Sequence, residues 1–239
     1  MPKTFCVSIV LLGCGLAVAV GQSQSAALTF SRGRFVSSVE LSGKAVWHYG
    51  SDKQTGTAKL EASANGQSRV ELQLDRGTRV ETQNAFTDSK RACTWSGLDG
   101  VVHTSASHNC WLGTVWFLPQ ITLQPGAGAV DAAISQVVTK DGRGRLHHER
   151  HPKDVKDEET AKLLAGISAS DLEIDPETGC PQILLFNSHP DNDAGVNIAT
   201  EIHFSDYRNI EGVAIPFHIQ KFVNHSLVLD LQIADVRLQ

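Results

Sequence analysis

The sequence lacks most of the features that mark enzymes and nucleic-acid-binding proteins. Its 21 lysines and arginines are outnumbered by 26 aspartates and glutamates, which gives a net charge of −5. Without a positive surplus the chain has no field that neutralises phosphates, so we expect no nucleic-acid partner. It also has no P-loop, no dinucleotide-binding glycine fingerprint and no GxSxG elbow. These absences argue against an enzyme, and we expect no cofactor.

A long apolar run occurs at the N-terminus, over residues 5–20, after a basic residue at Lys3. The run is short for a membrane span, contains two glycines and ends in small residues that suit signal peptidase. We therefore predict a cleaved export signal over residues 1–21, and a periplasmic location. The alternative is a lipid anchor at Cys14, because the residues around it loosely resemble the site at which bacterial lipoproteins are acylated.

Cysteine is scarce, and beyond the predicted export signal the chain contains Cys93, Cys110 and Cys180. In an oxidising compartment one pair is expected, and Cys93 with Cys110 is favoured because a loop of that size is easily closed. Such a disulfide contributes roughly 3 kcal/mol through loop-closure entropy. Cys180 then remains an odd thiol, either a buried cysteine that packs as a small apolar residue or a reactive one.

The C-terminal stretch, residues 201–239, has the clearest secondary-structure pattern. Apolar residues alternate with polar ones in three successive stripes, separated by turn sequences at residues 209–212 and 224–226. This period of two predicts an antiparallel meander with one buried face. The third stripe changes phase at Ala234-Asp235, which predicts a β-bulge. The apolar face must be covered by helices, by a second sheet or by a ligand.

The rest of the chain continues the same pattern, with two interruptions. Residues 58–64 and 70–74 predict a hairpin, and the Asn65-Gly66 dipeptide between them suits a type I′ turn. In contrast, residues 105–123 are strongly apolar and lack a period of two, which predicts a buried helix ended by Pro119. An amphipathic pattern over residues 153–167 predicts a second helix.

Histidines cluster at His147, His148 and His151. His147 and His151 have the spacing of the metalloprotease motif, but His148 occupies the position where that motif needs a glutamate. In a strand, His147 and His151 would face one side and His148 the other, so the three could not converge on a metal. We interpret them as surface residues of a hairpin and expect no metal, with a histidine-dependent metal hydrolase as the third hypothesis.

Two motifs in the last third of the chain carry a resemblance to a known family. They are a D-x-x-T-G-x-P turn at residues 175–181 and an F-S-D-Y-R…G-V-x-I-P-F block at residues 204–217. Together with the export signal, the strands and the apolar helix, they resemble periplasmic proteins of the outer-membrane lipoprotein carrier (LolA/LolB-like) superfamily, in particular uncharacterised acidobacterial members. The likeness covers roughly residues 47–239.

The resemblance implies an α+β fold, a strongly curved antiparallel sheet of about ten or eleven strands that forms an incomplete barrel lidded by helices. We expect this single domain to span residues 28–239. It would hold acyl chains of lipoproteins or other lipids in a hydrophobic cavity, and Arg69 is the candidate for the functional arginine of the carriers. By position, the resemblance assigns Trp111, Trp116, Phe117 and Leu118 to the lid, and Trp47, Leu60, Leu72, Phe204 and Phe217 to the concave wall.

We therefore predict a monomeric, non-catalytic protein of the periplasm that binds lipid, lipoprotein acyl chains or another apolar ligand. The Cys93–Cys110 disulfide departs from the best-known carriers, and a bridge near the lid would limit its opening. The alternative is a structural or envelope-sensing module whose cavity is filled by its own side chains and which binds an envelope protein.

Overall fold

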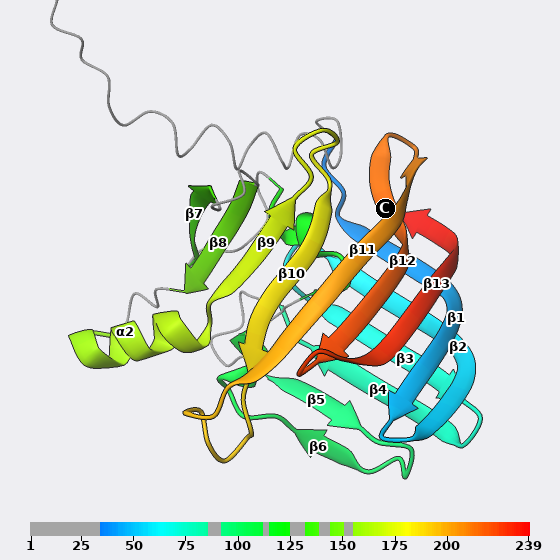
Figure 1. Ribbon diagram of the computed structural model, residues 1–239, viewed down its shortest axis with the longest axis horizontal. Helices are drawn as coiled ribbons and strands as arrows, with labels where there is room; N and C mark the ends of the chain where they lie inside the picture. The colour runs from blue at the N-terminus through cyan, green and yellow to red at the C-terminus, as the bar shows by residue number, and fades with distance from the viewer. Residues whose placement is uncertain (1–33, 86–91, 112–114, 125–131, 139–143, 151–154) are drawn as a thin grey trace, which may run out of the picture.

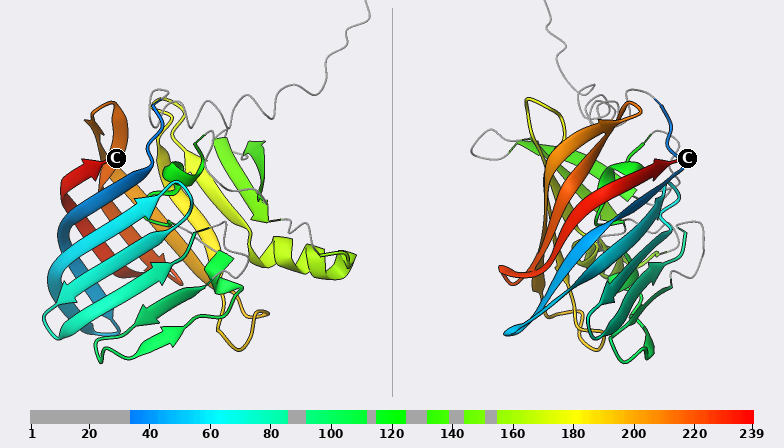
Figure 2. Two further views of the ribbon diagram at one scale, coloured as in Figure 1. Left: turned by 180° about the vertical axis from the view of Figure 1, so that it is seen from behind. Right: turned by 90° about the vertical axis from the view of Figure 1, so that its right-hand side faces the viewer.

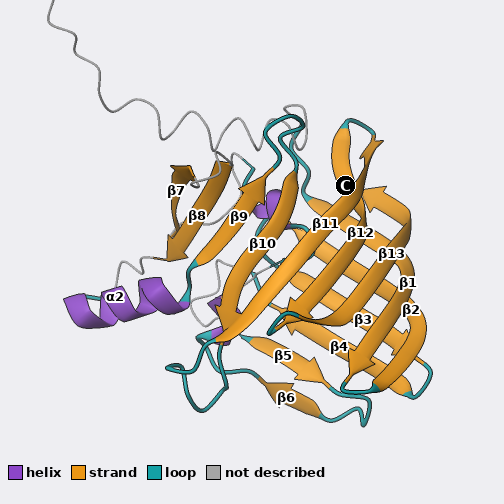
Figure 3. Ribbon diagram, in the orientation of Figure 1, coloured by secondary structure: helices purple, strands orange, loops and turns teal. Residues whose placement is uncertain are grey.

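The computed structural model describes residues 34–85, 92–111, 115–124, 132–138, 144–150 and 155–239. The predicted export signal and Cys14 lie outside these residues. The described chain forms one antiparallel sheet of thirteen strands, more than the ten or eleven expected, with three short helices (Figures 1 and 3). The strands are β1 Ser38–Tyr49, β2 Asp52–Ser63, β3 Ser68–Leu74, β4 Gly77–Gln83, β5 Cys93–Ser96, β6 Val102–Thr104, β7 Ala132–Val138, β8 Gly144–Arg150, β9 Ser170–Ile174, β10 Pro181–Ser188, β11 Ile198–Ile210, β12 Val213–Val223 and β13 Ser226–Leu238. The helices are η1 Asn109–Trp111, η2 Pro119–Thr122 and α2 Glu158–Ile167.

Two meanders make up this sheet, and they join at its middle. The strand order is β6-β5-β4-β3-β2-β1-β13-β12-β11-β10-β9-β8-β7. The first meander runs from β1 to β6 and the second from β7 to β13, and β1 pairs with β13 between them. The edge strands β6 and β7 are not paired with each other, so the strongly curved sheet stays open (Figure 2). This confirms the predicted fold class.

The C-terminal meander has the predicted turns and the predicted bulge. Glu211 and Gly212, and likewise Asn224 and His225, have positive φ angles, as two-residue hairpin turns with a right-handed twist require. In the pairing of β1 with β13, Ile233 lies opposite Gly43 and Asp235 opposite Ser42, so Ala234 is left without a partner in the register. The change of phase in the sequence is therefore a bulge.

The hairpin between β2 and β3 has the predicted strands but a different turn. The Ser63 N–H donates to the Gln67 carbonyl, and the Gly66 N–H donates to the Ser63 carbonyl. Gly66 has a φ of 87°, whereas Asn65 is not left-handed. The loop is therefore a type I turn followed by a glycine bulge instead of the predicted type I′ turn, because it is one residue longer than a two-residue turn allows.

The helix predicted over residues 105–123 is wrong in the part that the structure describes. This part holds only the two short 3₁₀ helices η1 and η2, and residues 112–114 lie outside the described ones. Val115 has a φ of 53°, which no right-handed helix can include. Pro119 begins η2 instead of ending a helix, because its fixed φ and missing N–H suit a first helical position.

The second predicted helix is present as α2. It begins after Asp157, whose carboxylate accepts a hydrogen bond from the Thr160 N–H at 2.7 Å and thereby caps the helix. Residues 151–154, where the prediction placed the start, are not described. In the described part of the chain, every helix is too short or too polar to cross a membrane.

Residues 115–124, part of the connection between the two edge strands, lie on the concave side of the sheet, and we call them the buried connection. Phe117, Leu118 and Ile121 are fully buried there, in one cluster with the apolar stripes of the strands. Gln124 anchors the end of this segment, because its side chain accepts from the Val36 N–H at 2.8 Å and donates to the Val36 carbonyl at 2.9 Å. This segment therefore covers the apolar face of the sheet, which is the role that was expected of the predicted helix.

Two glycines allow the sheet to bend this strongly. A Cβ on Gly43 in β1 would collide with the backbone carbonyl of Gln232, and a Cβ on Gly56 in β2 would collide with that of Gln73. Both glycines lie inside strands, where glycine is unfavourable unless another backbone approaches closely. Gly43 lies beside the bulge at Ala234, where β1 joins β13.

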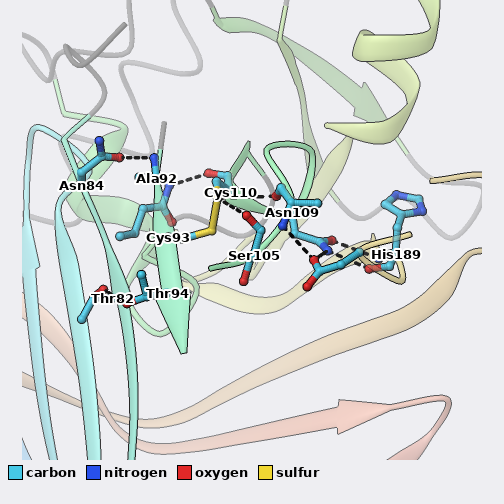
Figure 4. The surroundings of a disulfide bond; sticks show 12 residues. Thr82, Asn84, Ala92, Cys93, Thr94, Ser105, Asn109, Cys110 and His189 are labelled. Carbon is cyan, nitrogen blue, oxygen red and sulfur yellow. Dashed lines mark hydrogen bonds between the residues drawn. A yellow bond between two sulfur atoms is a disulfide. The ribbon is translucent and has the colours of Figure 1, made fainter. Parts of the chain in front are cut away.

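The predicted disulfide between Cys93 and Cys110 is present, with a Cα–Cα distance of 5.4 Å (Figure 4). It links the start of β5 to the segment that enters the concave side of the sheet. The same segment is held to β4 by a hydrogen bond of 2.6 Å from the Gln83 side chain to the Cys110 carbonyl. Cys180 is a free, partly buried thiol whose pKa is raised by burial.

Gly43→Ala should lower the free energy of unfolding by about 1–3 kcal/mol, because the added methyl group meets backbone that can move only if the bend relaxes. Urea denaturation measures the change. The control is Gly166→Ala in α2, where a Cβ has open space. There alanine should raise stability by about 1 kcal/mol. Equal stability of Gly43→Ala and the wild type would contradict this account of the bend.

Replacing Cys93 and Cys110 together by serine should lower the free energy of unfolding by about 3 kcal/mol, because the unfolded chain regains the entropy of the loop that the bond closes. Reducing the wild type with a thiol should have the same effect in urea denaturation. Cys180→Ser is the matched control and should leave the midpoint unchanged. A double variant as stable as the wild type would mean that the bond is dispensable for the fold.

Candidate functional site

The concave side of the sheet holds an open cavity beside the buried connection. It has two adjoining lobes, of about 640 Å³ and about 300 Å³, which share part of their lining. These volumes lie within the range of ligand pockets, about 300–1,000 Å³. We call the smaller one the apolar lobe; the residues that line it alone include Leu72, Val223, Val228 and Leu229. We call the larger one the polar lobe; the residues that line it alone include Gln83, Ser105, Asn109, Ser188 and Asp191.

Charged and aromatic side chains line both lobes and so lie at the boundary between them. They are Trp47 and Tyr49 from β1, Arg79 and Glu81 from β4, Trp116 from the buried connection and Lys221 from β12. Strand register brings the charges to the concave face: Arg79 pairs with Leu72, Glu81 with Val70, and Lys221 with Leu229. Each charge therefore occupies a position at which its neighbouring strand has a buried apolar residue.

Sequence reasoning missed Arg79 and Glu81 because the β4 sequence, GTRVETQ, has a single apolar residue. A pattern of hydrophobicity alone would place Val80 inside, yet it lies on the convex face. A signal was available in the turn before β4, where Leu74 pairs with Gly77. Continuing that register places Arg79 opposite Leu72, on the face that β3 buries.

Both cations lie against tryptophan rings. The Arg79 guanidinium carbon is 5.4 Å from the ring centroid of Trp47 and 5.6 Å from that of Trp95, and the Lys221 ammonium nitrogen is 4.6 Å from that of Trp116. Cation–π contacts of this kind are attractive and grow stronger as water is excluded. The tryptophans therefore hold the two positive charges at the cavity wall.

Glu81 is the carboxylate of this group. Its Oε1 lies 3.3 Å from an Arg79 guanidinium nitrogen. Burial raises the pKa of the Glu81 carboxyl, but the positive charges of Lys221 and Arg79 and a hydrogen bond from Trp116 outweigh burial, so that the pKa is lowered overall. Glu81 is thus ionised at neutral pH and offsets one of the two cations.

The residues that the sequence assigned to a ligand cavity lie in two different places. Trp47, Trp116 and Leu72 line the cavity. The others with described side chains pack into the core at 0–5% exposure; they are Leu60, Phe117, Leu118, Phe204 and Phe217. The side chain of Trp111 is outside the described ones. The concave side is therefore partly filled by the protein's own residues and partly open, and the role of these residues in holding a ligand stays a prediction.

Arg69, the candidate for a functional arginine, does not face the cavity. It alternates with Val70 in β3, so its side chain points to the convex face and donates to Glu71 at 2.6 Å. The arginine that lines both lobes is Arg79. Arg79 reaches the cavity because it lies opposite Leu72, whose side chain points to the concave face.

Two loops that line the polar lobe are held together by hydrogen bonds. Asn109 donates to the His189 carbonyl at 2.7 Å and accepts from the His189 N–H at 3.1 Å. Asp191 accepts from the Asn109 amide at 2.9 Å and from the Ala106 N–H at 2.8 Å. These contacts join the loop after β6 to the loop after β10 (Figure 4), and the disulfide ties the first of them to β5. The two loops and β5 are therefore connected to one another at this side of the cavity.

The histidine cluster has the strand geometry expected of it where it is described. His147 pairs with Asp171 and His148 with Ser170, so the two rings leave opposite faces of β8. The ring nitrogens of His147 lie 2.9 Å from Glu149 and 2.7 Å from Asp171, and these carboxylates raise its pKa against the opposing effect of burial. His151 lies outside the described residues, among which no three His, Cys, Asp or Glu side chains are placed to hold a metal.

A Ser–His–Asp row, which the sequence analysis did not single out, crosses β11, β12 and β13. The Ser205 hydroxyl is 3.2 Å from His218 Nδ1, and His218 Nε2 is 3.1 Å from Asp230. None of the three lines either lobe, and Asp230 also accepts from Gln220 at 3.0 Å. We interpret the row as a ladder of cross-strand hydrogen bonds on the convex face, of the kind that stabilises sheets.

Comparison with known proteins identifies the fold. No family model matches the sequence, and a search of curated proteins finds no match. Solved structures do match over nearly the whole chain. A domain named for outer-membrane lipoprotein sorting, from Vibrio parahaemolyticus, is 10% identical, with a TM-score of 0.51 and coverage of 91% of each chain.

Two further structures agree with it. A DUF1329 family protein from Desulfovibrio piger is 11% identical, with a TM-score of 0.53 and coverage of 92% of this chain and 93% of that one. A LolA superfamily protein from Nitrosomonas europaea is 12% identical, with a TM-score of 0.51 and coverage of 93% and 94%. At such low identity the likeness establishes the architecture alone: the chain has the open, strongly curved antiparallel barrel of LolA-like proteins.

Proposed function

We propose that this protein is a non-catalytic carrier that holds the alkyl chain of a lipid or lipoprotein in the cavity of its open barrel. The observation that carries the proposal is the apolar lobe. It is lined by side chains such as Leu72, Val228 and Leu229, which belong to the sheet, and Trp116, which belongs to the buried connection. Burying an alkyl chain there would be favourable by about 0.8 kcal/mol per methylene. The LolA-like fold and the likeness to the Vibrio domain, which is named for lipoprotein sorting, support the same class of ligand.

A periplasmic location is part of the proposal. The Cys93–Cys110 disulfide fits an oxidising compartment. Residues 1–21 have the composition of an export signal. A protein that carries lipid between the inner and outer membranes has to be in the periplasm. The predicted location therefore agrees with the function proposed for the cavity.

The second candidate is a module that binds an envelope protein. The observation in its favour is the edge of the sheet at β6, where Val101 and Val102 are 51% and 69% exposed. An exposed apolar strand edge can pair with an extended segment of another chain. The filled part of the concave side, around Phe117 and Leu118, fits this candidate as well as the first. The two differ in whether the open cavity takes an alkyl chain.

The length of an n-alkanol should determine how tightly the protein binds it. From hexanol to decanol, each added methylene should tighten binding about fourfold until the apolar lobe is filled. Three tryptophans line the cavity, so a titration of intrinsic fluorescence can follow binding. An affinity independent of chain length, or no binding, would reject the carrier and favour the second candidate.

Val228→Phe should weaken decanol binding at least tenfold, because the larger side chain takes up space that about two methylenes of the ligand would fill. The matched control is Val80→Phe, the same change on the convex face of β4, which should bind decanol like the wild type. Circular dichroism checks that both variants are folded. Equal binding by the two variants would place the ligand elsewhere.

A further inference from the structure

The boundary between the lobes carries more positive than negative charge. Arg79 and Lys221 contribute two cations, and Glu81 is the single carboxylate that lines the apolar lobe with them. Glu81 is bonded to Arg79 at 3.3 Å. Among the described residues, the ammonium of Lys221 has a ring contact with Trp116 and no hydrogen-bond acceptor. Asp191 lines the polar lobe, but hydrogen bonds from Ala106 and Asn109 hold it at the rim.

The aromatic rings are already engaged by the protein's own cations. Trp95 has Arg79 near it and stacks on His103 at 4.3 Å between ring centroids. Trp47 also lies against Arg79, and Trp116 against Lys221. A cationic ligand would have to displace these charges and would be repelled by them. The free hydrogen-bonding capacity of the boundary is that of donors: the three ammonium protons of Lys221 and the remaining guanidinium protons of Arg79.

These donors lie between an apolar lobe and a polar one, which is the arrangement that an amphiphile fits. We propose that the ligand is a single-chain amphiphile with an anionic head, a carboxylate or a phosphate, which Lys221 and Arg79 bind while the chain lies in the apolar lobe. This inference rests on the proposed carrier function and names its ligand class. The apolar lobe, at about 300 Å³, is at the lower end of the usual pocket size, which favours one chain over several.

The test compares ligands that share one alkyl chain and differ in the charge of the head: dodecanoate, dodecanol and dodecyltrimethylammonium. Calorimetry at neutral pH should give dodecanoate the highest affinity, about 10- to 100-fold above dodecanol, as a charged hydrogen bond would. The trimethylammonium compound should bind most weakly. Acetate and inorganic phosphate test the head group without a chain and should not bind measurably.

Three variants assign the effect to the boundary. Lys221→Met keeps the apolar stem and should reduce dodecanoate binding about 10- to 100-fold more than it changes dodecanol binding. Lys44→Met, an exposed lysine on the opposite face of the sheet, is the matched control and should bind both ligands like the wild type. Glu81→Gln should tighten dodecanoate binding, because the head group no longer competes with a carboxylate for the cations. If Lys221→Met does not fold, the affinity of Glu81→Gln for dodecanoate tests the proposal instead.

The outcomes separate this inference from the proposed function. If dodecanol binds as tightly as dodecanoate and Glu81→Gln changes neither, the carrier function stands and the anionic head is rejected. If none of the three dodecyl compounds binds, both fail. If acetate or phosphate binds as tightly as dodecanoate, the site is one for small anions and the amphiphile is rejected.

Discussion

The pairing of β1 with β13 is the constraint on which the rest of this structure depends. It joins two meanders that are far apart in sequence into one sheet, through a register that runs from Val39 opposite Leu238 to Trp47 opposite Leu229. The bulge at Ala234 and the absence of a Cβ at Gly43 let the strands bend at that junction. Without the bend the sheet would be flatter, and the buried connection, residues 115–124, could not lie inside it.

That connection divides the concave side into a filled part and an open part. Phe117, Leu118 and Ile121 pack against the stripes of the central strands and complete a core. Next to Trp116 the concave side is no longer filled by side chains of the buried connection. There the open cavity is lined by apolar residues and by the charged side chains of Arg79, Glu81 and Lys221. Each of these charges is compensated by a ring or by an opposite charge, as a partly desolvated ion requires. The cavity is therefore part of the architecture of the sheet and not a defect in its packing.

The disulfide and the loop contacts give the cavity a firm rim on its polar side. Cys110 is bonded to Cys93 in β5, and Asn109 next to it is held by the loop after β10. A carrier usually needs a part that opens. In this protein the disulfide bond ties the segment at Cys110 to β5. Tyr49, which lines both lobes, is 70% exposed.

The sequence by itself determined the elements whose cause is local. Alternation of apolar residues predicted the C-terminal strands, the change of phase predicted the bulge at Ala234, and spacing predicted the Cys93–Cys110 bond. Only the tertiary structure decided what residues 105–111 and 115–123 do, because a buried apolar segment can be covered by the sheet without forming a long helix. It also decided which polar residues face inward: Arg79, Glu81 and Lys221 are inside because strand register, not hydrophobicity, sets the direction of a side chain.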